Sequence, residues 1–119
     1  MKRHSLLRLE RITRTCEFKK ALKNGIAHRG KTLNLSVAQN NRGISRIGIC
    51  LRRENFKLAA QRNKLRRYLK EMFRLNKHIF KKGYDIIAIP KRGCVNLTFS
   101  ELQDDFIETV KKAGILTTA

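Results

Sequence analysis

The sequence is short of acidic residues, and this shortage is its strongest compositional signal. It holds 9 Asp and Glu against 28 Lys and Arg, a net charge of +19 over 119 residues. Solubility alone needs far less charge, so the excess indicates a polyanionic partner such as a nucleic acid. Residues 83–119 hold four basic and five acidic residues, whereas 1–31 and 52–82 hold ten and twelve basic residues with two acidic ones each. We therefore expect one strongly basic side and a nearly neutral back.

Cysteine is also sparse. Cys16, Cys50 and Cys94 are odd in number and widely spaced, with no Cys-x-x-Cys pair. This pattern favours reduced thiols in the cytoplasm over a disulfide framework or a zinc site. No stretch reaches the roughly 18 apolar residues of a membrane-spanning helix, and charges interrupt the N-terminal segment before a signal-peptide core can form. We expect a cytoplasmic protein.

The chain has no repeats, no low-complexity linkers and a single proline, Pro90. Its length suits one domain over 1–119, with a modest core that requires neither disulfides nor metal. Within it we expect a basic N-terminal extension over 1–12 and a tail over 114–119.

Catalytic groups are missing as well. The nine carboxylates lie apart or on the predicted last helix, and no His stands beside a carboxylate in a motif. His4, His28 and His78 are scattered, and Asp104-Asp105 fits a helix surface better than a metal site. We therefore propose no catalytic residue, identify no metal ligand, and disfavour a standalone nuclease.

The order of predicted elements defines the fold class. A short helix should begin near Thr15, capped by its hydroxyl, and end at Asn24-Gly25. Thr98 and Glu101 read as a capping box that opens the last helix. Between them we expect strands over 26–29, 33–39 and 46–51, a helix over 58–77 and a buried central strand over 84–90. The order α-β-β-β-α-β-α predicts an α+β fold, a two-layer sandwich on a mixed four-stranded sheet.

The alternation of the strands predicts two different sheet faces. In the strand over 33–39, Leu33, Leu35 and Val37 share one face and Asn34, Ser36 and Ala38 the other. The apolar face must be covered by helices. The small polar face leaves room for a ligand strand.

The helix over 59–74 carries the clearest functional pattern. Basic residues recur every four positions at Arg62, Arg66, Lys70 and Arg74, opposite an apolar stripe. A solvated helix face is the ordinary alternative, but such faces mix charges of both signs. Like charges at this spacing repel, and a polyanion removes that repulsion.

The block AAQRNKLRRYLKEMFR over 59–74 resembles the signature of the bacterial ribonuclease P protein family. Further similar elements are Arg8-Leu9, Glu17-Phe18, Arg46-Ile47-Gly48, Asp85-Ile86-Ile87 and Phe99-x-Glu101-Leu102. The resemblance implies the fold of the second domain of ribosomal protein S5, with a left-handed β-α-β crossover. It also implies a partner RNA that is itself catalytic, whose bound Mg²⁺ assists removal of the 5′ leader from precursor tRNA. No organic cofactor, membrane or obligate protein partner is expected.

The resemblance assigns residues to two surfaces. The first should bind the RNA subunit: Arg62, Asn63, Lys64, Arg66, Arg67, Lys70 and Arg74. The second should bind the precursor-tRNA leader: Phe18, Leu22, Asn34, Ser36, Arg46, Arg52 and Arg53. A base stacked on Phe18 would add roughly 1–3 kcal/mol to leader binding with little sequence preference. Core packing is the alternative role for this ring. For Asn63 the alternative is a structural hydrogen bond at the start of the helix.

Two features depart from the family pattern. Leu22 and Ser36 stand where members often carry aromatics, so fewer stacking platforms are expected. Lys57-Leu58-Ala59-Ala60 replaces the usual Gly-x-Ala-Val before the signature. The competing interpretation is a small basic ribosomal protein, which the signature block and the lack of long basic tails disfavour. A sequence-specific DNA binder fits less well, because no helix-turn-helix spacing is present.

Overall fold

The computed structural model describes residues 11–12 and 15–116, and in this part of the chain four strands form one mixed sheet. The strands are β1 (Ile26–Arg29), β2 (Leu33–Gln39), β3 (Arg46–Ile49) and β4 (Tyr84–Pro90), in the sheet order β1-β2-β4-β3. β2 runs antiparallel to both its neighbours, and β3 runs parallel to β4. The predicted mixed sheet and element order are confirmed. The hand of the β3-to-β4 connection stays a prediction of the resemblance.

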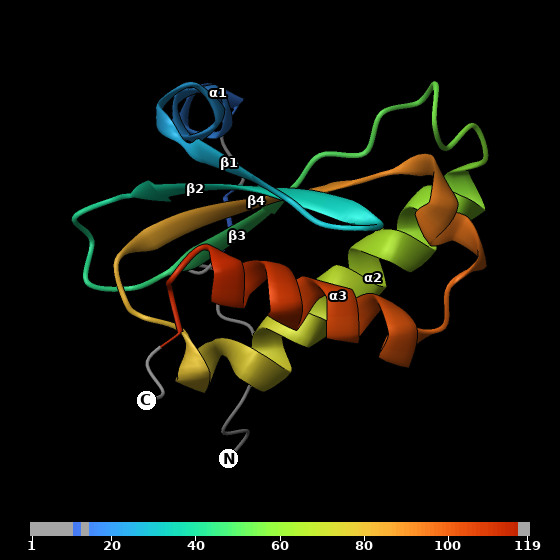
Figure 1. The fold of residues 1–119 in the computed structure, drawn as a ribbon. Helices are drawn as coiled ribbons and strands as arrows, with labels where there is room; N and C mark the ends of the chain where they lie inside the picture. Colours follow the sequence, from blue (N-terminus) through green and yellow to red (C-terminus); the bar gives the residue numbers. More distant parts are fainter. Residues whose placement is uncertain (1–10, 13–14, 117–119) are drawn as a thin grey trace, which may run out of the picture.

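The helices lie on both faces of the sheet. α2 (Ala59–Asn76) and α3 (Phe99–Lys112) pack beneath one face, and α1 (Thr15–Asn24) lies across the other (Figure 1). Two short 3-10 helices, η2 (Lys77–Ile79) and η3 (Arg92–Asn96), were not predicted from the sequence. No helix among the described residues combines the length and apolarity needed to cross a membrane.

The predicted element ends agree closely with the structure. α3 has its capping box: Thr98 Oγ1 accepts from the Glu101 N–H at 3.2 Å, and the Thr98 N–H donates to Glu101 Oε1 at 3.0 Å. α1 begins at Thr15 as expected, but its predicted hydroxyl cap lies outside the described side chains. β3 ends at Ile49, two residues earlier than predicted, although the Cys50 N–H still donates to Ala88 O at 2.8 Å.

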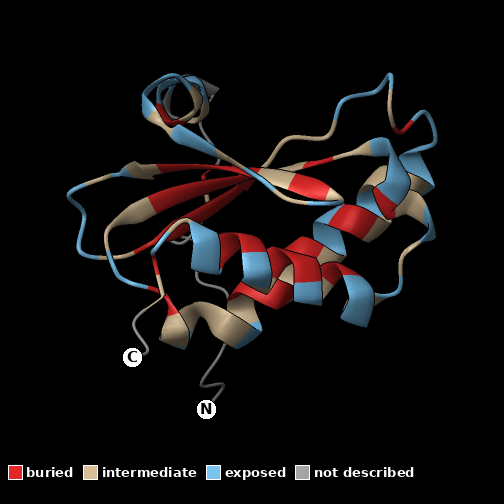
Figure 2. Ribbon diagram, in the orientation of Figure 1, coloured by how far each residue is buried: buried red, intermediate tan, exposed pale blue. Residues whose placement is uncertain are grey.

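The main core fills the space between the sheet and the helix pair α2 and α3. Figure 2 shows the buried residues on the facing sides of these elements. The predicted apolar stripes are confirmed, with Leu33, Leu35 and Val37 from β2 packed against α2 and α3. The helices contribute Leu65, Leu69, Met72, Phe73, Leu102, Phe106 and Val110.

The opposite face is less polar than its β2 residues predicted. Ile87 of β4, Ala21 of α1 and Ile12 form a second, smaller cluster, joined by partly buried Phe18 and Leu22. The prediction of an open small polar face was therefore wrong for its middle, because β4 is apolar on both sides and α1 covers it there. The ends of the face stay accessible.

The prediction that Asp105 lies on a helix surface was also wrong. Expected at the helix surface beside Asp104, it is only 9% exposed. Its carboxylate accepts from the Thr32 N–H at 2.7 Å, the Thr32 hydroxyl at 2.5 Å and the Lys31 N–H at 3.3 Å. Burial alone would raise the pKa of Asp105, but these hydrogen bonds outweigh burial and lower it. Asp105 thus fastens the β1–β2 turn to α3.

Candidate RNA interface

The outer side of α2 presents the basic residues that the sequence placed on a ridge. Leu65, Leu69, Met72 and Phe73 bury the inner side of the helix against the sheet. The middle of the outer side therefore faces solvent: Asn63, Arg66 and Arg67 are exposed, and Lys64 and Lys70 are half-buried. This exposed segment can reach a phosphate backbone, and arginine forks suit that contact.

The two ends of the ridge make contacts within the protein. Arg62 donates through Nη1 to Phe56 O at 2.7 Å and to Lys57 O at 3.1 Å, which ties the preceding loop to α2. Arg74 holds Glu71 with two hydrogen bonds of 2.7 Å each. The hydrogen bond from Arg74 lowers the pKa of Glu71. The middle residues are therefore better placed for direct RNA contact than either end.

Asn63 and Lys64 have weak internal contacts. Asn63 Oδ1 accepts from Arg66 Nη1 at 3.4 Å, on the exposed surface. This long bond gives only weak support to a structural role at the helix start. The Lys64 ammonium lies 5.5 Å from the centre of the Tyr68 ring, a cation–π distance. Neither contact removes the polar group from solvent.

Phe18 lies where α1 crosses β3. Gly48 allows this close approach, since a Cβ there would lie 3.0 Å from Phe18 Cε2 and 2.8 Å from Ile87 Cδ1. The ring is only partly buried. It lines a cavity of about 190 Å³ that Arg66 and Lys70 of α2 also line. The structure therefore joins the two predicted surfaces at one concavity, which the sequence did not indicate.

α1 divides the outer face of the sheet into two halves. The half that contains Asn34 of β2 and Ile89 of β4 holds several of the other predicted leader residues. Leu22 is partly buried there, as is Ile89, which was not predicted; Asn34 Oδ1 is buried without a hydrogen-bond partner among the described residues. Arg52 and Arg53 are exposed on the loop after β3. Arg52 lies 3.7 Å from Glu54, but both side chains are about two-thirds exposed (65% and 71%), so this pair is weak.

Ser36 and Arg46 are not brought to that half. Ser36 is 5% exposed and lies under the end of α1, so close that a Cβ on Gly25 would collide with its hydroxyl. Arg46 is 6% exposed, and its Nε and Nη2 donate to the two carboxylate oxygens of Asp85 at 2.8 and 2.7 Å. Both side chains therefore offer little surface to a leader strand.

Asp85 is the polar residue that sequence reasoning missed. Burial raises its pKa, but hydrogen bonds from Arg46 and Asn40 outweigh burial and hold the pKa below its ordinary range. The pairing follows from register, because Arg46 and Asp85 stand opposite each other at the starts of parallel β3 and β4. The only sequence signal was a carboxylate inside an apolar strand.

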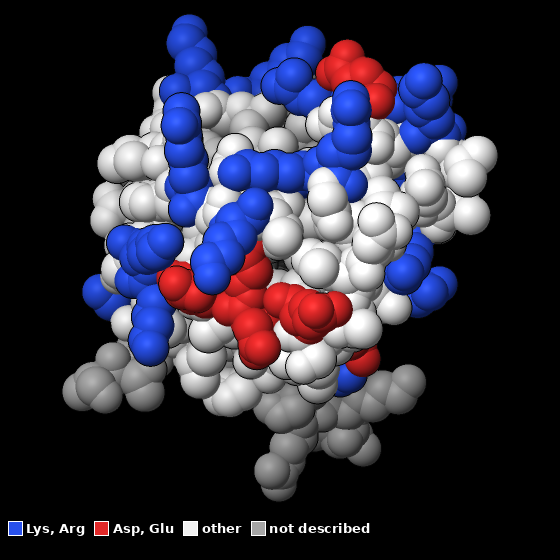
Figure 3. Space-filling model, turned by 45° about the vertical axis from the view of Figure 1, so that its right-hand side comes forward, with Lys and Arg blue, Asp and Glu red and all other residues white. Residues whose placement is uncertain are grey.

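Acidic side chains gather on another part of the surface. Figure 3 shows most of the acidic side chains on this face in one patch, with Lys and Arg on one side of it. The exposed acids of α3 are Glu101, Asp104 and Glu108. The described residues contain no group of three or more His, Cys, Asp or Glu side chains placed to hold a metal ion.

Known proteins with the same sequence pattern and fold were found. A family model described as Ribonuclease P matches residues 6–114. Among relatives, a ribonuclease P protein component from Clostridium botulinum (strain 657 / Type Ba4) is 31% identical over 106 residues, covering 88% of this chain and 95% of the relative. One from Thermotoga sp. (strain RQ2) is 35% identical over 88 residues, 74% of each chain.

Solved structures agree. The RNase P protein from Thermotoga maritima aligns with a TM-score of 0.78 and 28% identity, covering 87% of this chain and 96% of that one. An RNase P protein from Staphylococcus aureus gives 0.82 at 23% identity, covering 91% of this chain and 98% of that one, a likeness of fold. These matches do not favour a ribosomal protein. The chain belongs to the ribonuclease P protein component family.

Proposed function

We propose that this chain, as a protein component of ribonuclease P, binds the RNA subunit through the middle of α2 and the 5′ leader of precursor tRNA along the outer sheet face. The single observation that carries this proposal is the concavity shared by Phe18, Arg66 and Lys70. A strand leaving the sheet face there meets the basic ridge at once. One protein can therefore hold the substrate strand and the RNA subunit side by side.

The contact with the RNA subunit uses mainly phosphate recognition. Arg66 and Arg67 are exposed on adjacent positions of α2 and can each form bidentate bonds to phosphate oxygens. Asn63 can bond a sugar or a base edge, and Lys64 and Lys70 add point charges. Arg62 and Arg74 act at the ends, where their internal bonds fix the loop and the last turn of the helix.

The contact with the leader combines stacking and charge. The Phe18 ring is partly exposed and can stack on a base, and Leu22 extends the apolar floor. Asn34 is partly exposed on the same side of the sheet and adds a polar amide beside this floor. Arg52 and Arg53 are exposed on the loop after β3 and neutralise phosphates of the leader. Such contacts select little sequence, which suits many different leaders.

Hydrolysis of the phosphodiester is assigned to the RNA subunit and its Mg²⁺. The described side chains do not form a set that fits the metal, so no step is given to a protein-held ion. Mg²⁺ on RNA phosphates can activate water and stabilise the leaving oxygen. The protein binds both strands, orients them and lowers the repulsion between them. We place this activity in the cytoplasm.

Reconstitution with the cognate RNA subunit tests the proposal. The purified chain alone should leave precursor tRNA intact in Mg²⁺. Added to the RNA subunit, it should lower the Mg²⁺ concentration needed for cleavage and favour precursor over mature tRNA. Cleavage by the protein without RNA would contradict the assignment of chemistry, and an unchanged Mg²⁺ requirement with no preference for precursor would contradict the role in binding.

Phe18 variants test the leader contact separately. Phe18→Ala should weaken precursor binding by roughly 1–3 kcal/mol, the value of one stacked base, and leave mature tRNA binding unchanged. Phe18→Leu is the matched control for packing, because it keeps an apolar side chain and removes the ring. If Phe18→Leu restores full precursor binding, Phe18 acts by packing alone.

A further inference from the structure

A small hollow opens where the first turns of α2 meet η3. It measures about 170 Å³, and most of its lining is apolar. The lining residues are Ala60, Gln61, Lys64 and Leu65 of α2 and Val95 of η3. Leu65 is buried in the main core, and Val95 packs against that core while staying partly exposed. The floor of the hollow is therefore part of the rigid body of the protein.

The groups at the start of α2 leave binding capacity unused. Leu58, the N-cap residue, is 62% exposed, although helices favour Ser, Thr, Asp or Asn at this position. It adds exposed apolar surface next to Gln61, whose N–H donates to Leu58 O at 3.1 Å. Gln61 Oε1 accepts from the Leu58 N–H only at 3.4 Å, and Gln61 Nε2 makes no hydrogen bond among the described residues. An apolar surface and a spare amide donor thus lie side by side.

The surroundings of the hollow are positively charged. Lys64 lines it, and the Lys64 ammonium lies 5.5 Å from the centre of the Tyr68 ring. Arg92 is exposed three residues before Val95, and residues at this spacing share one side of a 3-10 helix. Lys57, two residues before α2, is also exposed. Among the described residues no acidic side chain lines the hollow. Apolar lining bordered by cations suits a ligand that joins an apolar ring to phosphate groups.

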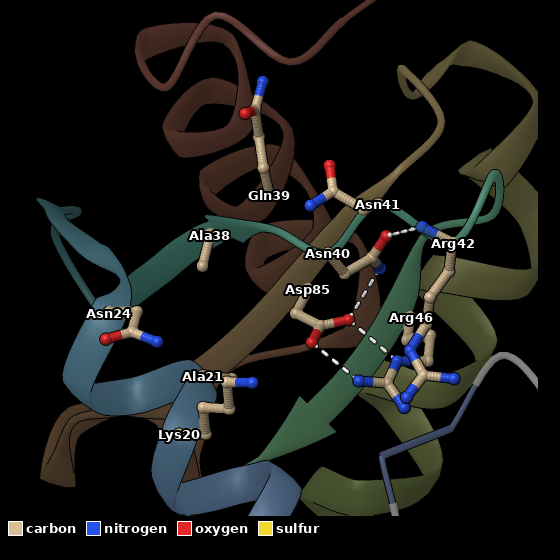
Figure 4. Close-up of a pocket in the computed structure, with 10 residues that line it drawn as sticks. All are labelled: Lys20, Ala21, Asn24, Ala38, Gln39, Asn40, Asn41, Arg42, Arg46 and Asp85. Carbon is tan, nitrogen blue, oxygen red and sulfur yellow. Dashed lines mark hydrogen bonds and ion pairs between the residues drawn. The ribbon is translucent and has the colours of Figure 1, made fainter.

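The larger pocket on the outer sheet face has its charged groups engaged already. It measures about 280 Å³ and lies between the last turns of α1 and the turn that contains Asn41. Arg46 there holds both carboxylate oxygens of Asp85, and Asn40 donates to the same carboxylate at 2.8 Å (Figure 4). The lining of the hollow at α2 has no such ion pair within the described part of the chain. Its groups stay available to a ligand.

We propose that the hollow between α2 and η3 binds one unpaired nucleobase of the RNA subunit. The base lies against Ala60 and Val95, and Gln61 Nε2 donates to an acceptor on its edge. Lys64 supplies positive charge for the phosphate of the same nucleotide. The volume is below the roughly 300–1,000 Å³ typical of ligand pockets, which fits a base rather than a whole nucleotide. Bases within a duplex are stacked and paired, so the base must be unpaired.

This inference rests on the proposed function and deepens it. The middle of α2 recognises phosphates, which every RNA carries, and such contacts contain no sequence information. A base held at the start of the same helix would add recognition of one position in the RNA subunit. It would also fix the register of α2 along that RNA.

Filling the hollow tests the inference in the complex with the cognate RNA subunit. Ala60→Leu places additional methyl groups in the hollow and should weaken binding of the full-length chain about tenfold, as expected for the loss of one base contact. Ala59→Leu is the matched control, because Ala59 is the neighbouring exposed residue of α2 and does not line the hollow. It should leave the affinity unchanged. Leucine suits a helix nearly as well as alanine, so both variants should unfold in urea like the wild type.

The salt dependence separates a base contact from a phosphate contact. Ala60→Leu removes no charge, so the slope of log affinity against log salt concentration should equal that of the wild type. A smaller slope would mean that the variant has displaced phosphate contacts along α2, and it would contradict the assignment of a base to the hollow.

NMR of the isotope-labelled full-length chain tests the class of ligand directly. The 5′-monophosphates of adenosine, guanosine, cytidine and uridine are titrated separately, and ribose 5-phosphate is the probe that carries a phosphate without a base. We expect the Val95 methyl and Gln61 side-chain amide signals to shift with at least one mononucleotide at concentrations about tenfold below those needed with ribose 5-phosphate. Ala60→Leu should abolish that difference.

Three results would overturn the inference. Equal losses of RNA affinity in Ala60→Leu and Ala59→Leu would show that the start of α2 tolerates no added bulk, whatever the hollow holds. Equal responses to mononucleotides and ribose 5-phosphate would reduce the site to general charge attraction. Full RNA affinity in Ala60→Leu would leave the hollow to an apolar side chain of a protein partner. If the wild-type chain still lowered the Mg²⁺ requirement in reconstitution, the proposed function would stand while this inference failed.

Discussion

The two faces of the sheet differ in what their residues can be used for. The face toward α2 and α3 is closed by a large apolar cluster that includes Phe73 and Phe106, both 0% exposed. The face toward α1 has a small cluster around Ile87, and polar concavities on either side of the helix. Stability is therefore concentrated on one side of the sheet, and accessible polar groups on the other.

This division explains how a chain with a net charge of +19 can fold. Self-repulsion opposes compaction, and the apolar burial that offsets it is gathered on one face. α2 belongs to both functions, because its inner stripe closes the core while its outer residues form the basic ridge. The ridge is thereby held rigid by the core, which pre-organises it for RNA.

The largest expected effect is on the free energy of unfolding, which should depend far more on the face toward α2 and α3 than on the face toward α1. Phe106→Ala should lower the free energy of unfolding by about 3–5 kcal/mol, because it empties the centre of the main core. Phe18→Ala should lower it by only about 1 kcal/mol, since its ring is partly exposed in the smaller cluster. Urea unfolding of both variants measures the difference. Equal losses would show that the outer face stabilises the fold as much as the main core.

A smaller loss of folding stability is expected when the hydrogen bonds between α3 and the β1–β2 turn are weakened. Asp105→Asn should cost about 1–3 kcal/mol at pH 7, because the amide cannot accept all the bonds donated by Thr32 and Lys31. Asp104→Asn, exposed on the same helix, is the control and should stay within about 0.5 kcal/mol of wild type.

The stability difference between wild type and Asp105→Asn should depend on pH in one direction. The pKa of Asp105 is lowered in the folded protein, so its contribution is present above the unfolded value of about 3.9 and is lost as the pH falls through the lower folded pKa. The difference between wild type and Asp105→Asn should therefore shrink below about pH 4. A difference that stays constant into that range would mean that charge on Asp105 is irrelevant.

Local patterns predicted the elements well. Thr98 and Glu101 mark the start of α3, and the run over 84–90 marks β4, because caps and hydrophobic periodicity depend on neighbours in sequence. The apolar stripe and the exposed ridge of α2 follow from the same kind of local periodicity. Such features are encoded within one or two turns of the chain.

Contacts between distant segments were not predictable in this way. Arg46 and Asp85 are 39 residues apart, and only the parallel register of β3 and β4 brings them together. Thr32 and Asp105 are 73 residues apart. α1 has a recognisable apolar side, but the sequence did not indicate that it crosses the middle of the outer face. The meeting of Phe18 with Arg66 and the pocket near Asn41 depend on that placement.

The smallest effect on stability is expected for the basic ridge of α2. Variants there test whether RNA binding depends on the position of these arginines or only on the total charge of the protein. Arg66→Ala with Arg67→Ala should leave the unfolding free energy within about 0.5 kcal/mol, because both side chains are exposed. The slope of log affinity for the RNA subunit against log salt concentration should fall by about 1.4, or nearer 1.8 for duplex regions, if each arginine holds one phosphate. Lys111→Ala with Lys112→Ala removes the same charge from the exposed end of α3 and is the matched control. Because net charge is equal in the two double variants, any difference in slope reports position alone. Identical slopes would mean that the RNA responds to the total charge of the protein, and the ridge on α2 would lose its special role.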